Sequence, residues 1–383
     1  MKFPSMAEAD GRTLGDEEVA AAERVIRSGM LNSVWGTEAR ALEREIARVY
    51  GSRHAITCSS GTAALHLSVV AAAPDPGDEV ITTPITDFGT VAPILAQNAV
   101  PVFADVDPFD GNLDPDAVAA LIGPRTKAIM AVHLFGAPAR VGELRALADE
   151  HGLTLIEDCA QAWLTELPGG GLAGTAGQVG CLSLQQWKHI TCGDGGVAIT
   201  DDDELARRMR LFSDKGWDRA AGRSHAAFGV NYRMTELQAA VARAQFAKLP
   251  GVLAARRRTA GQLLDALKGV PGVCLPRPDG HAWWLFPIVC PDGDAPELAT
   301  HLAAAGIPAR AGYLAEPLNR APVWEAAIYG SSRYPLEGYR PNPCPRAELM
   351  VDRTLLVIDW NENYTPEHVE LIAQEITKFR ARP

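Results

Sequence analysis

The sequence lacks the features that mark metal-binding, disulfide-stabilised or membrane-spanning proteins. Its seven cysteines are an odd number, and no two of them form a C-x-x-C pair. This excludes the usual zinc spacings, predicts no metal site and argues against a disulfide framework, so we expect reduced cysteines in a cytoplasmic protein. No uninterrupted apolar stretch approaches ~18 residues, which predicts no membrane span. The N-terminus also has no apolar core of signal-peptide length.

Positive charge is in short supply. Lysine and arginine total 36 against 47 aspartates and glutamates, which gives a net charge of -11. Such an acidic chain is a poor partner for nucleic acid or an anionic membrane, but net charge says nothing against a local basic pocket for a phosphate. Hydrophobic residues make up 47% of the 383 positions, so the chain is globular and long enough for two or three domains.

Short β-rich runs alternate with helical segments through residues 54–184, for example HAITCSS, DEVITTPI, VPVFADVD and TLIEDCAQ. This alternation predicts an α/β domain with a mostly parallel sheet flanked by helices. Two helical segments follow at 234–249 and 252–269, and the rest mixes strands and helices around a Pro- and Gly-rich loop region at 311–346. We therefore expect a large domain over 1–250 and a smaller C-terminal α+β domain over 251–383.

Three chemically distinctive segments follow predicted strands. They are the SSGT run at 59–62, Asp158, and the loop around Lys188. Because ligands of α/β sheets bind beyond the carboxyl ends of the strands, we expect one shared site there. Pyridoxal 5'-phosphate (PLP) needs such a set: an amine for its aldehyde, an acid for its ring nitrogen and a phosphate cradle.

The segment SSGTAAL is the candidate phosphate cradle. Gly61 would let the backbone approach an anion, Ser60 and Thr62 supply hydroxyls, and a helix begins here. Ser183, five residues before Lys188, is a second hydroxyl candidate. The alternative is an ordinary helix start built from small residues.

Asp158 ends an apolar strand, where a carboxylate needs a cation or donor to offset its desolvation. A pyridinium would supply that partner, and Gln161 could then hydrogen-bond the ring hydroxyl. The alternative role of Asp158 is a helix N-cap. Glu157 should point to the other side of the strand and be structural.

Lys188 lies in CLSLQQWKHITCGDGG, between a strand and a glycine-rich turn, and is the candidate Schiff-base lysine. A solvated loop lysine is the alternative. Its neighbour His189 is interpreted as structural. Phe88 follows another strand and is either the aromatic that stacks on the cofactor ring or a core residue.

In order along the chain, the sequence resembles the DegT/StrS-type aminotransferases, members of the aspartate-aminotransferase superfold (fold type I). The resemblance rests on several strings: SGMLNSVWG, SSGTAAL, GDEVITTPITDFGT, PVFADVD, AVHLFGAPA, LIEDCAQA, the S-x-x-x-x-K stretch and FGVNYRMTELQAAVARAQ. It implies a seven-stranded sheet and PLP as cofactor. It also implies the roles given above for Lys188, Asp158, Gln161, Ser183 and Phe88. Through Asn231, which in the family reaches the neighbouring subunit's phosphate, it implies a homodimer with shared active sites.

The strings QQWKHITCGDGG and SDKGW are similar to the branch that aminates scyllo-inosose-type keto-cyclitols in aminoglycoside pathways. A nucleotide-sugar aminotransferase is the main alternative. A dehydratase would have histidine in place of Lys188, and a catalytically silent regulator should have lost Lys188 or Asp158. A nicotinamide-dependent dehydrogenase would need G-x-G-x-x-G after the first strand, where SSGTAAL stands instead.

The resemblance further implies a ping-pong transamination from L-glutamine or L-glutamate to a ketone, with Lys188 moving the proton and pyridoxamine 5'-phosphate formed between the two halves. A cationic or amide group must hold the donor carboxylate. Lys215, Arg233 and Arg310 are candidates for it, and Tyr313, after GIPAR, is a candidate for the wall of the substrate pocket.

Overall fold

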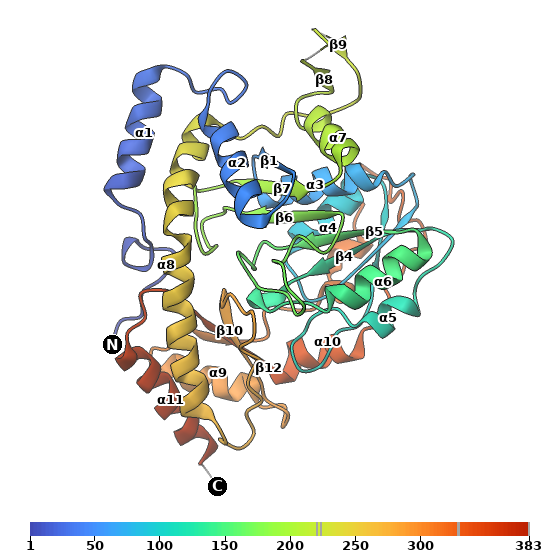
Figure 1. The fold of residues 1–383 in the computed structure, drawn as a ribbon. Coiled ribbons are helices and arrows are strands. Elements are labelled where there is room, and N and C mark those ends of the chain that lie inside the picture. Colours follow the sequence, from blue (N-terminus) through green and yellow to red (C-terminus); the bar gives the residue numbers. More distant parts are fainter. Residues whose placement is uncertain (220, 223, 328–329, 382–383) are drawn as a thin grey trace.

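In the computed structural model, which describes residues 1–219, 221–222, 224–327 and 330–381, the chain forms a seven-stranded sheet with helices on both faces (Figure 1). Five strands pair in parallel, and β7 is antiparallel to both of its neighbours, so β1 runs in the same direction as β6. The strand order is β1 (His54–Cys58), β7 (Gly196–Thr200), β6 (Val179–Ser183), β5 (Thr154–Asp158), β4 (Thr126–Val132), β2 (Glu79–Thr82) and β3 (Val100–Phe103). This confirms the predicted fold class.

Helices cover the sheet because its strands are buried on both faces. One face packs on α3 (Gly61–Ala72), α4 (Phe88–Ala96) and α7 (Asp203–Ser213). The other face packs on α2 (Glu38–Tyr50), α5 (Pro115–Ala119), α6 (Val141–His151) and the first half of α8 (Glu236–Leu267). None of the helices in the described ranges is long and apolar enough to cross a membrane.

A second, antiparallel sheet lies below the first in Figure 1. Its strand order is β10 (Leu285–Val289), β12 (Leu355–Asp359) and β11 (Ala309–Ala311). Its core includes side chains of α9 (Ala295–Ala304), α11 (Pro366–Arg380) and the second half of α8. The remaining elements are α1 (Asp16–Ser28), α10 (Pro345–Leu349), the β8/β9 hairpin (Trp217–Asp218 and Ser224–His225) and short helices at Ala9–Gly11, Leu134–Gly136, Leu318–Arg320, Pro322–Glu325 and Met350–Thr354.

The two helical segments predicted at 234–249 and 252–269 are one helix. α8 runs for 32 residues and contains Pro250, and its halves are buried against different cores. Packing on both sides outweighs the single backbone hydrogen bond that a proline removes. The predicted division after residue 250 therefore falls inside a helix, and we keep it as a proposal about folding units.

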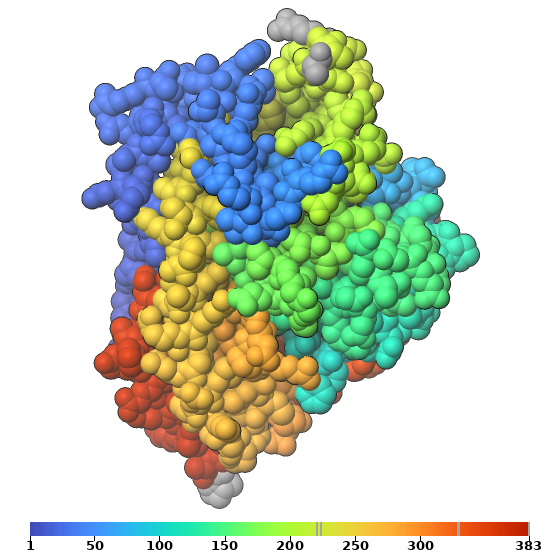
Figure 2. Space-filling model, in the orientation of Figure 1, coloured from blue at the N-terminus to red at the C-terminus, as the bar shows by residue number. Residues whose placement is uncertain are grey.

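The N-terminal segment packs on the C-terminal part of the chain. Phe3 belongs to the core of the second sheet, with its ring 5.3 Å from that of Tyr364 and 4.8 Å from that of His368. In Figure 2 the N-terminal segment and the C-terminal helix lie on the same side of the molecule, with the surface of α8 beside them. The two ends of the chain thus build one region.

Candidate active site

The carboxyl ends of the large sheet open into a cavity of about 960 Å³. Because β1, β5 and β6 run in the same direction, the residues that follow them meet at one edge of the sheet. Its wall includes Ser60, Gly61, Thr62, Asp158, Gln161, Ser183, Lys188, Arg310 and Tyr313. Nine residues predicted from the sequence therefore share one cavity.

The start of α3 forms an anion cradle. Ser60 is the N-cap of this helix, and its Oγ accepts a hydrogen bond of 3.0 Å from the backbone N–H of Ala63. Gly61 is required here, because a Cβ at this position would lie 2.7 Å from the Cβ of Ser183. The helix N-terminus and the hydroxyls of Thr62 and Ser183 thus face the same space, as a bound phosphate requires.

Asp158 is the last residue of β5 and is 4% exposed. Its Oδ2 accepts a hydrogen bond of 2.8 Å from the hydroxyl of Thr90, and its Oδ1 accepts one of 3.0 Å from the N–H of Ala160. Burial raises the pKa of this carboxyl. No ion pair of Asp158 occurs among the described residues, so the geometry suits a bound cation such as a protonated ring nitrogen.

Glu157, the neighbour of Asp158, has its carboxylate in a different environment. Its oxygens accept hydrogen bonds from the backbone N–H groups of Gly174, Ala176 and Gly177 at 2.6–2.9 Å, and Oε2 lies 2.9 Å from Nε2 of His133. These partners saturate the carboxylate away from the cavity. The prediction of a structural role for Glu157 is confirmed.

Lys188 lies in the loop between β6 and β7, on the cavity wall. Its Nζ is 4.2 Å from the centre of the Trp284 ring. Burial lowers its pKa to about 8, against the opposing effect of the carboxylates of Asp158 and Asp87. A larger share of the amine is therefore proton-free near neutral pH than in a solvated lysine, which favours nucleophilic attack. His189 is buried, with Nε2 3.0 Å from the carbonyl oxygen of Ala282, as expected of the structural role predicted for it.

Gln161 and Tyr313 also line the cavity. The Oε1 of Gln161 accepts a hydrogen bond of 2.7 Å from the N–H of Phe135, and its Nε2 lies 3.4 Å from the Tyr313 hydroxyl. Burial raises the pKa of Tyr313. The amide N–H₂ is thus directed toward the cavity, where it can donate to a ring oxygen.

Four predicted residues lie outside this cavity wall. Asp87 and Gly89, the neighbours of Phe88, line the cavity. The ring of Phe88 instead packs in the core, with its centre 6.4 Å from the centre of the Trp324 ring. Lys215 and Arg233 both pair with Asp214, and Arg310 is the only one of the three donor-carboxylate candidates that lines the cavity of its own chain. Asn231 is exposed and also lies outside.

Sequence reasoning missed several wall residues. The hydroxyl of Thr90 donates a hydrogen bond to Asp158, and it lies 2.6 Å from the hydroxyl of Thr86. The T-x-x-x-T spacing of these two threonines is the sequence feature that could have indicated the contact. Trp284 lies 96 positions from Lys188 in the chain, and residues 1–6 enter the wall from the opposite end of the sequence. No local pattern indicates either contact.

The fold, with a half-buried lysine and a buried aspartate in one cavity at the carboxyl edge of its sheet, is that of the fold type I aminotransferases. DesV from S. venezuelae is 33% identical, with a TM-score of 0.86 over 96% of this chain and 95% of that one. An aminotransferase from Psychrobacter cryohalolentis is 30% identical, with a TM-score of 0.85 over 96% and 97%. DesI, solved in the presence of its TDP-sugar product, is 29% identical, with a TM-score of 0.83 over 96% and 90%.

The match to a known family covers nearly the whole sequence. Residues 12–377 match the DegT/DnrJ/EryC1/StrS aminotransferase family. The chain belongs to this family of sugar aminotransferases, whose members are PLP enzymes, and the predicted family and enzyme class are confirmed.

Proposed function

We propose that this aminotransferase transfers an amino group from L-glutamine or L-glutamate to a ketone on a cyclitol or sugar ring, using PLP, in the biosynthesis of an aminoglycoside-type secondary metabolite. The observation that carries the proposal is the meeting of an anion cradle, a buried acid and a half-buried amine in one cavity. The free cysteines fit the reducing conditions of the cytoplasm, where we place the enzyme.

The residues of the cavity fit PLP. Ser60, Gly61, Thr62 and Ser183 would hold its phosphate, and Gln161 would donate to its ring oxygen. Asp158 would pair with the ring nitrogen, where a buried carboxylate gains the cation it needs. When bound, PLP supplies an aldehyde and a ring that withdraws electrons from the reacting carbon.

The protein groups have distinct tasks. Lys188 would bind the cofactor through its amine. Once released, the same amine would hold a proton and move it between carbon atoms. A pKa of about 8 suits this task, because it lies near neutral pH. Asp158, held by Thr90, keeps a negative charge beside the ring nitrogen. Trp284 covers the Lys188 ammonium and narrows access of water to it.

The charges on the wall favour a neutral, hydroxyl-rich acceptor such as a keto-cyclitol. Arg310 is paired with Asp359, and Lys2 is paired with Glu8 and Asp10, so these cations are already neutralised. Asp87 and Asp194 add further negative charge to the wall. A pyrophosphate would therefore find little attraction in the part of the cavity built by this chain.

A nucleotide-linked keto-sugar is the second candidate acceptor. DesI, a relative, was solved with a TDP-sugar product. In this chain Lys215, Arg219 and Arg233 surround the single carboxylate of Asp214, which leaves an excess of positive charge beside the exposed Asn231. A partner subunit presenting this surface would attract a diphosphate.

A homodimer with shared active sites completes the proposal. The N-terminal part of the chain exposes large apolar side chains, with Val19 67%, Ile26 62% and Trp35 72% exposed, as expected of a face that a second copy covers. Asn231 lies outside the cavity of its own chain, as the shared-site hypothesis requires. Mixing Lys188→Ala and Asn231→Ala subunits should restore about a quarter of wild-type activity, because half of the dimers regain one intact site.

The decisive test is attachment of the cofactor. Purified protein with PLP should show a visible absorbance band, and borohydride should fix the cofactor to Lys188, located by peptide mapping. Lys188→Ala should lose both signals, whereas Lys127→Ala, which changes an exposed lysine outside the cavity, should retain both. Attachment at another lysine would refute the assignment.

Substrate choice needs separate assays. Glutamine and glutamate should be compared as donors against scyllo-inosose, related keto-cyclitols and nucleotide-linked keto-sugars. Turnover of keto-cyclitols supports the first candidate acceptor, and turnover of nucleotide-linked ketones alone would replace it with the second.

A further inference from the structure

Arg12 connects the N-terminal segment to the backbone of the candidate lysine. Its side chain is 6% exposed, and its Nη1 donates a hydrogen bond of 2.9 Å to the carbonyl oxygen of Lys188. Gln186 adds a second link from the same loop, because its Nε2 donates to the carbonyl oxygen of Met6 at 2.9 Å. The lysine loop is therefore fixed by residues near the start of the chain.

A second buried arginine holds the other side of the same region. Arg256, on α8, donates from Nη1 to the carbonyl oxygens of Trp283, Trp284 and Trp360 at 2.8–3.1 Å. Its Nε donates to Oε2 of Glu362 at 2.9 Å. Arg256 thus fixes the backbone of Trp284, whose ring contacts the Lys188 amine and whose Nε1 donates to the carbonyl oxygen of Trp187 at 2.7 Å.

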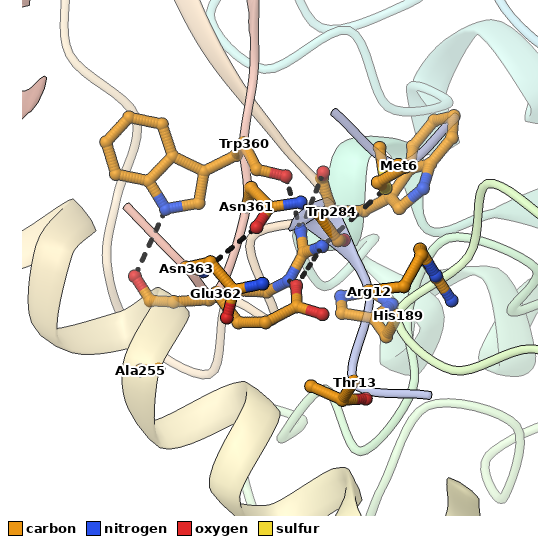
Figure 3. A network of polar contacts seen from close by, with 12 residues as sticks. Met6, Arg12, Thr13, His189, Ala255, Trp284, Trp360, Asn361, Glu362 and Asn363 are labelled. Atoms are coloured by element: carbon orange, nitrogen blue, oxygen red, sulfur yellow. Dashed lines mark hydrogen bonds and ion pairs between the residues drawn. The ribbon is translucent and has the colours of Figure 1, made fainter. Parts of the chain in front are cut away.

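The charges in this region are unbalanced. Figure 3 shows the side chains of Arg12, His189 and Glu362 near one another, and the Glu362 carboxylate acts electrostatically on the Arg12 guanidinium. Of the two buried arginines, Arg256 is paired with Glu362, whereas Arg12 feels that carboxylate only through its charge. Nε and Nη2 of Arg12 and Oε1 of Glu362 have no hydrogen-bond partner among the described residues.

Such an arrangement is a costly way to stabilise a fold. A buried guanidinium with two unused donors loses hydration that one backbone hydrogen bond does not replace, and an apolar side chain of similar size would avoid this cost. Among the described residues, the hydrogen bond that the Arg12 guanidinium does make is to Lys188. A role in placing that residue explains why a charge is kept here.

We propose that Arg12 is a positioning residue for Lys188. Its guanidinium holds the Lys188 carbonyl and thereby sets the direction in which the side chain leaves the loop toward Asp158. Glu362, which is hydrogen-bonded to Arg256, acts on Arg12 only through its charge. The inference rests on the proposed role of Lys188 as the residue that binds PLP.

The test compares Arg12→Met and Arg12→Lys with Arg27→Met, which removes an arginine paired with Glu23 on the exposed face of α1. In the protein without cofactor, acylation of Lys188 by a limiting amount of acetic anhydride is measured by peptide mapping, with Lys127 as internal reference. Arg12→Met should raise the relative acylation rate of Lys188 at least about threefold, because the released loop exposes the amine. Arg27→Met should leave it unchanged.

A second readout uses the protein loaded with PLP. Arg12→Met should weaken the visible circular dichroism band of the bound cofactor and lower kcat about tenfold with little change in KM for the amino donor. Arg12→Lys keeps a charged donor and should recover part of both signals. A folded Arg12→Met protein with unchanged acylation and dichroism would overturn the proposal.

Two further outcomes are also decisive. If thermal unfolding shows that Arg12→Met does not fold, Arg12→Lys and Glu362→Gln are tested instead. An acylation rate of Lys188 between the wild-type value and the expected threefold increase supports the proposal. A wild-type acylation rate overturns it. If wild-type protein does not bind PLP, the proposed cofactor is wrong. The acylation series then still shows whether Arg12 positions the Lys188 amine.

Discussion

The cavity has two walls of different origin. The inner wall consists of residues at the strand ends of one sheet, including Gly61, Asp158 and Ser183. The outer wall joins residues 1–6 to Arg310 and other residues of the second sheet and the segment after it. The inner wall is thus set by strand direction, whereas the outer wall depends on packing between the two ends of the chain.

This difference separates two properties of the enzyme. The inner wall holds groups whose positions the sheet fixes to the accuracy that bond making requires. The outer wall carries paired charges, such as Arg310 with Asp359, and would contact the part of a substrate that extends beyond the proposed cofactor. Substitutions on the inner wall should therefore change kcat, and substitutions on the outer wall should change KM and substrate preference.

The largest effect is expected from Asp158→Asn. Loss of the negative charge beside the cofactor ring should lower kcat roughly 10²–10³-fold. The protein should unfold at the same temperature or higher, because the raised pKa of Asp158 shows that burial disfavours its charged form. Kinetics and thermal unfolding measure the two effects.

Glu157→Gln is the matched control for Asp158→Asn. It alters the adjacent carboxylate, which is saturated by backbone N–H groups. It should lower the unfolding temperature and leave the kcat of the folded enzyme close to wild type. Equal kinetic losses in both variants would contradict the division between the two carboxylates.

The second prediction concerns pH. With a Lys188 pKa of about 8, acylation of Lys188 in cofactor-free protein should rise about tenfold per pH unit below that value and level off above it. Near neutral pH its proton-free fraction should exceed that of a solvated lysine by roughly two orders of magnitude. In Asp158→Asn the inflection should move lower, because a carboxylate that favours the charged amine is gone. If acylation of Lys188 levels off only at the pH expected of a solvated lysine, the lowered pKa is contradicted.

A smaller effect is expected from Thr90→Val, which removes the hydroxyl that donates to Oδ2 of Asp158 at 2.8 Å. A lost hydrogen bond to a charged group should cost about tenfold in kcat. Thr86→Val removes only the next hydroxyl of the pair and should cost less. Steady-state kinetics of both variants, with cofactor affinity measured separately, tests this order.

The smallest effect is expected on the outer wall. Arg310→Met should raise KM for a substrate roughly three- to tenfold with kcat little changed, because the lost group binds ground state and transition state alike. Arg320→Met is a close control: its pair with Asp352 has nearly the same exposure as the pair of Arg310 with Asp359, but it lies outside the cavity. A fall in kcat for Arg310→Met would place Arg310 in the chemistry.

How far the sequence predicts this molecule follows the same division. The alternation of strands and helices, and the segments around Gly61, Asp158 and Lys188, are local patterns, and each leads to the inner wall. Trp284 and residues 1–6 are brought to the cavity by contacts between distant parts of the chain, which no local pattern encodes.

Two groups of residues show where local reasoning reaches its limit. Phe88 has the expected place after a strand, but the direction of its ring is set by packing against Trp324. Lys215 and Arg233 have the expected charge, but Asp214 draws both of them together outside the cavity of their own chain. Sequence position and residue type indicated the neighbourhood of these residues and left the orientation of their side chains open.

The reversed direction of β7 bears on how Lys188 can move. Because β6 and β7 are antiparallel neighbours, the loop from 184 to 195 leaves one strand and enters the adjacent one, so it is anchored at both ends to the same strand pair. By contrast, the segment after β1 leads directly into a helix. If Lys188 binds and releases the cofactor in every catalytic cycle, as proposed, its amine can therefore move by rotation of its own four-carbon side chain while its backbone stays in place.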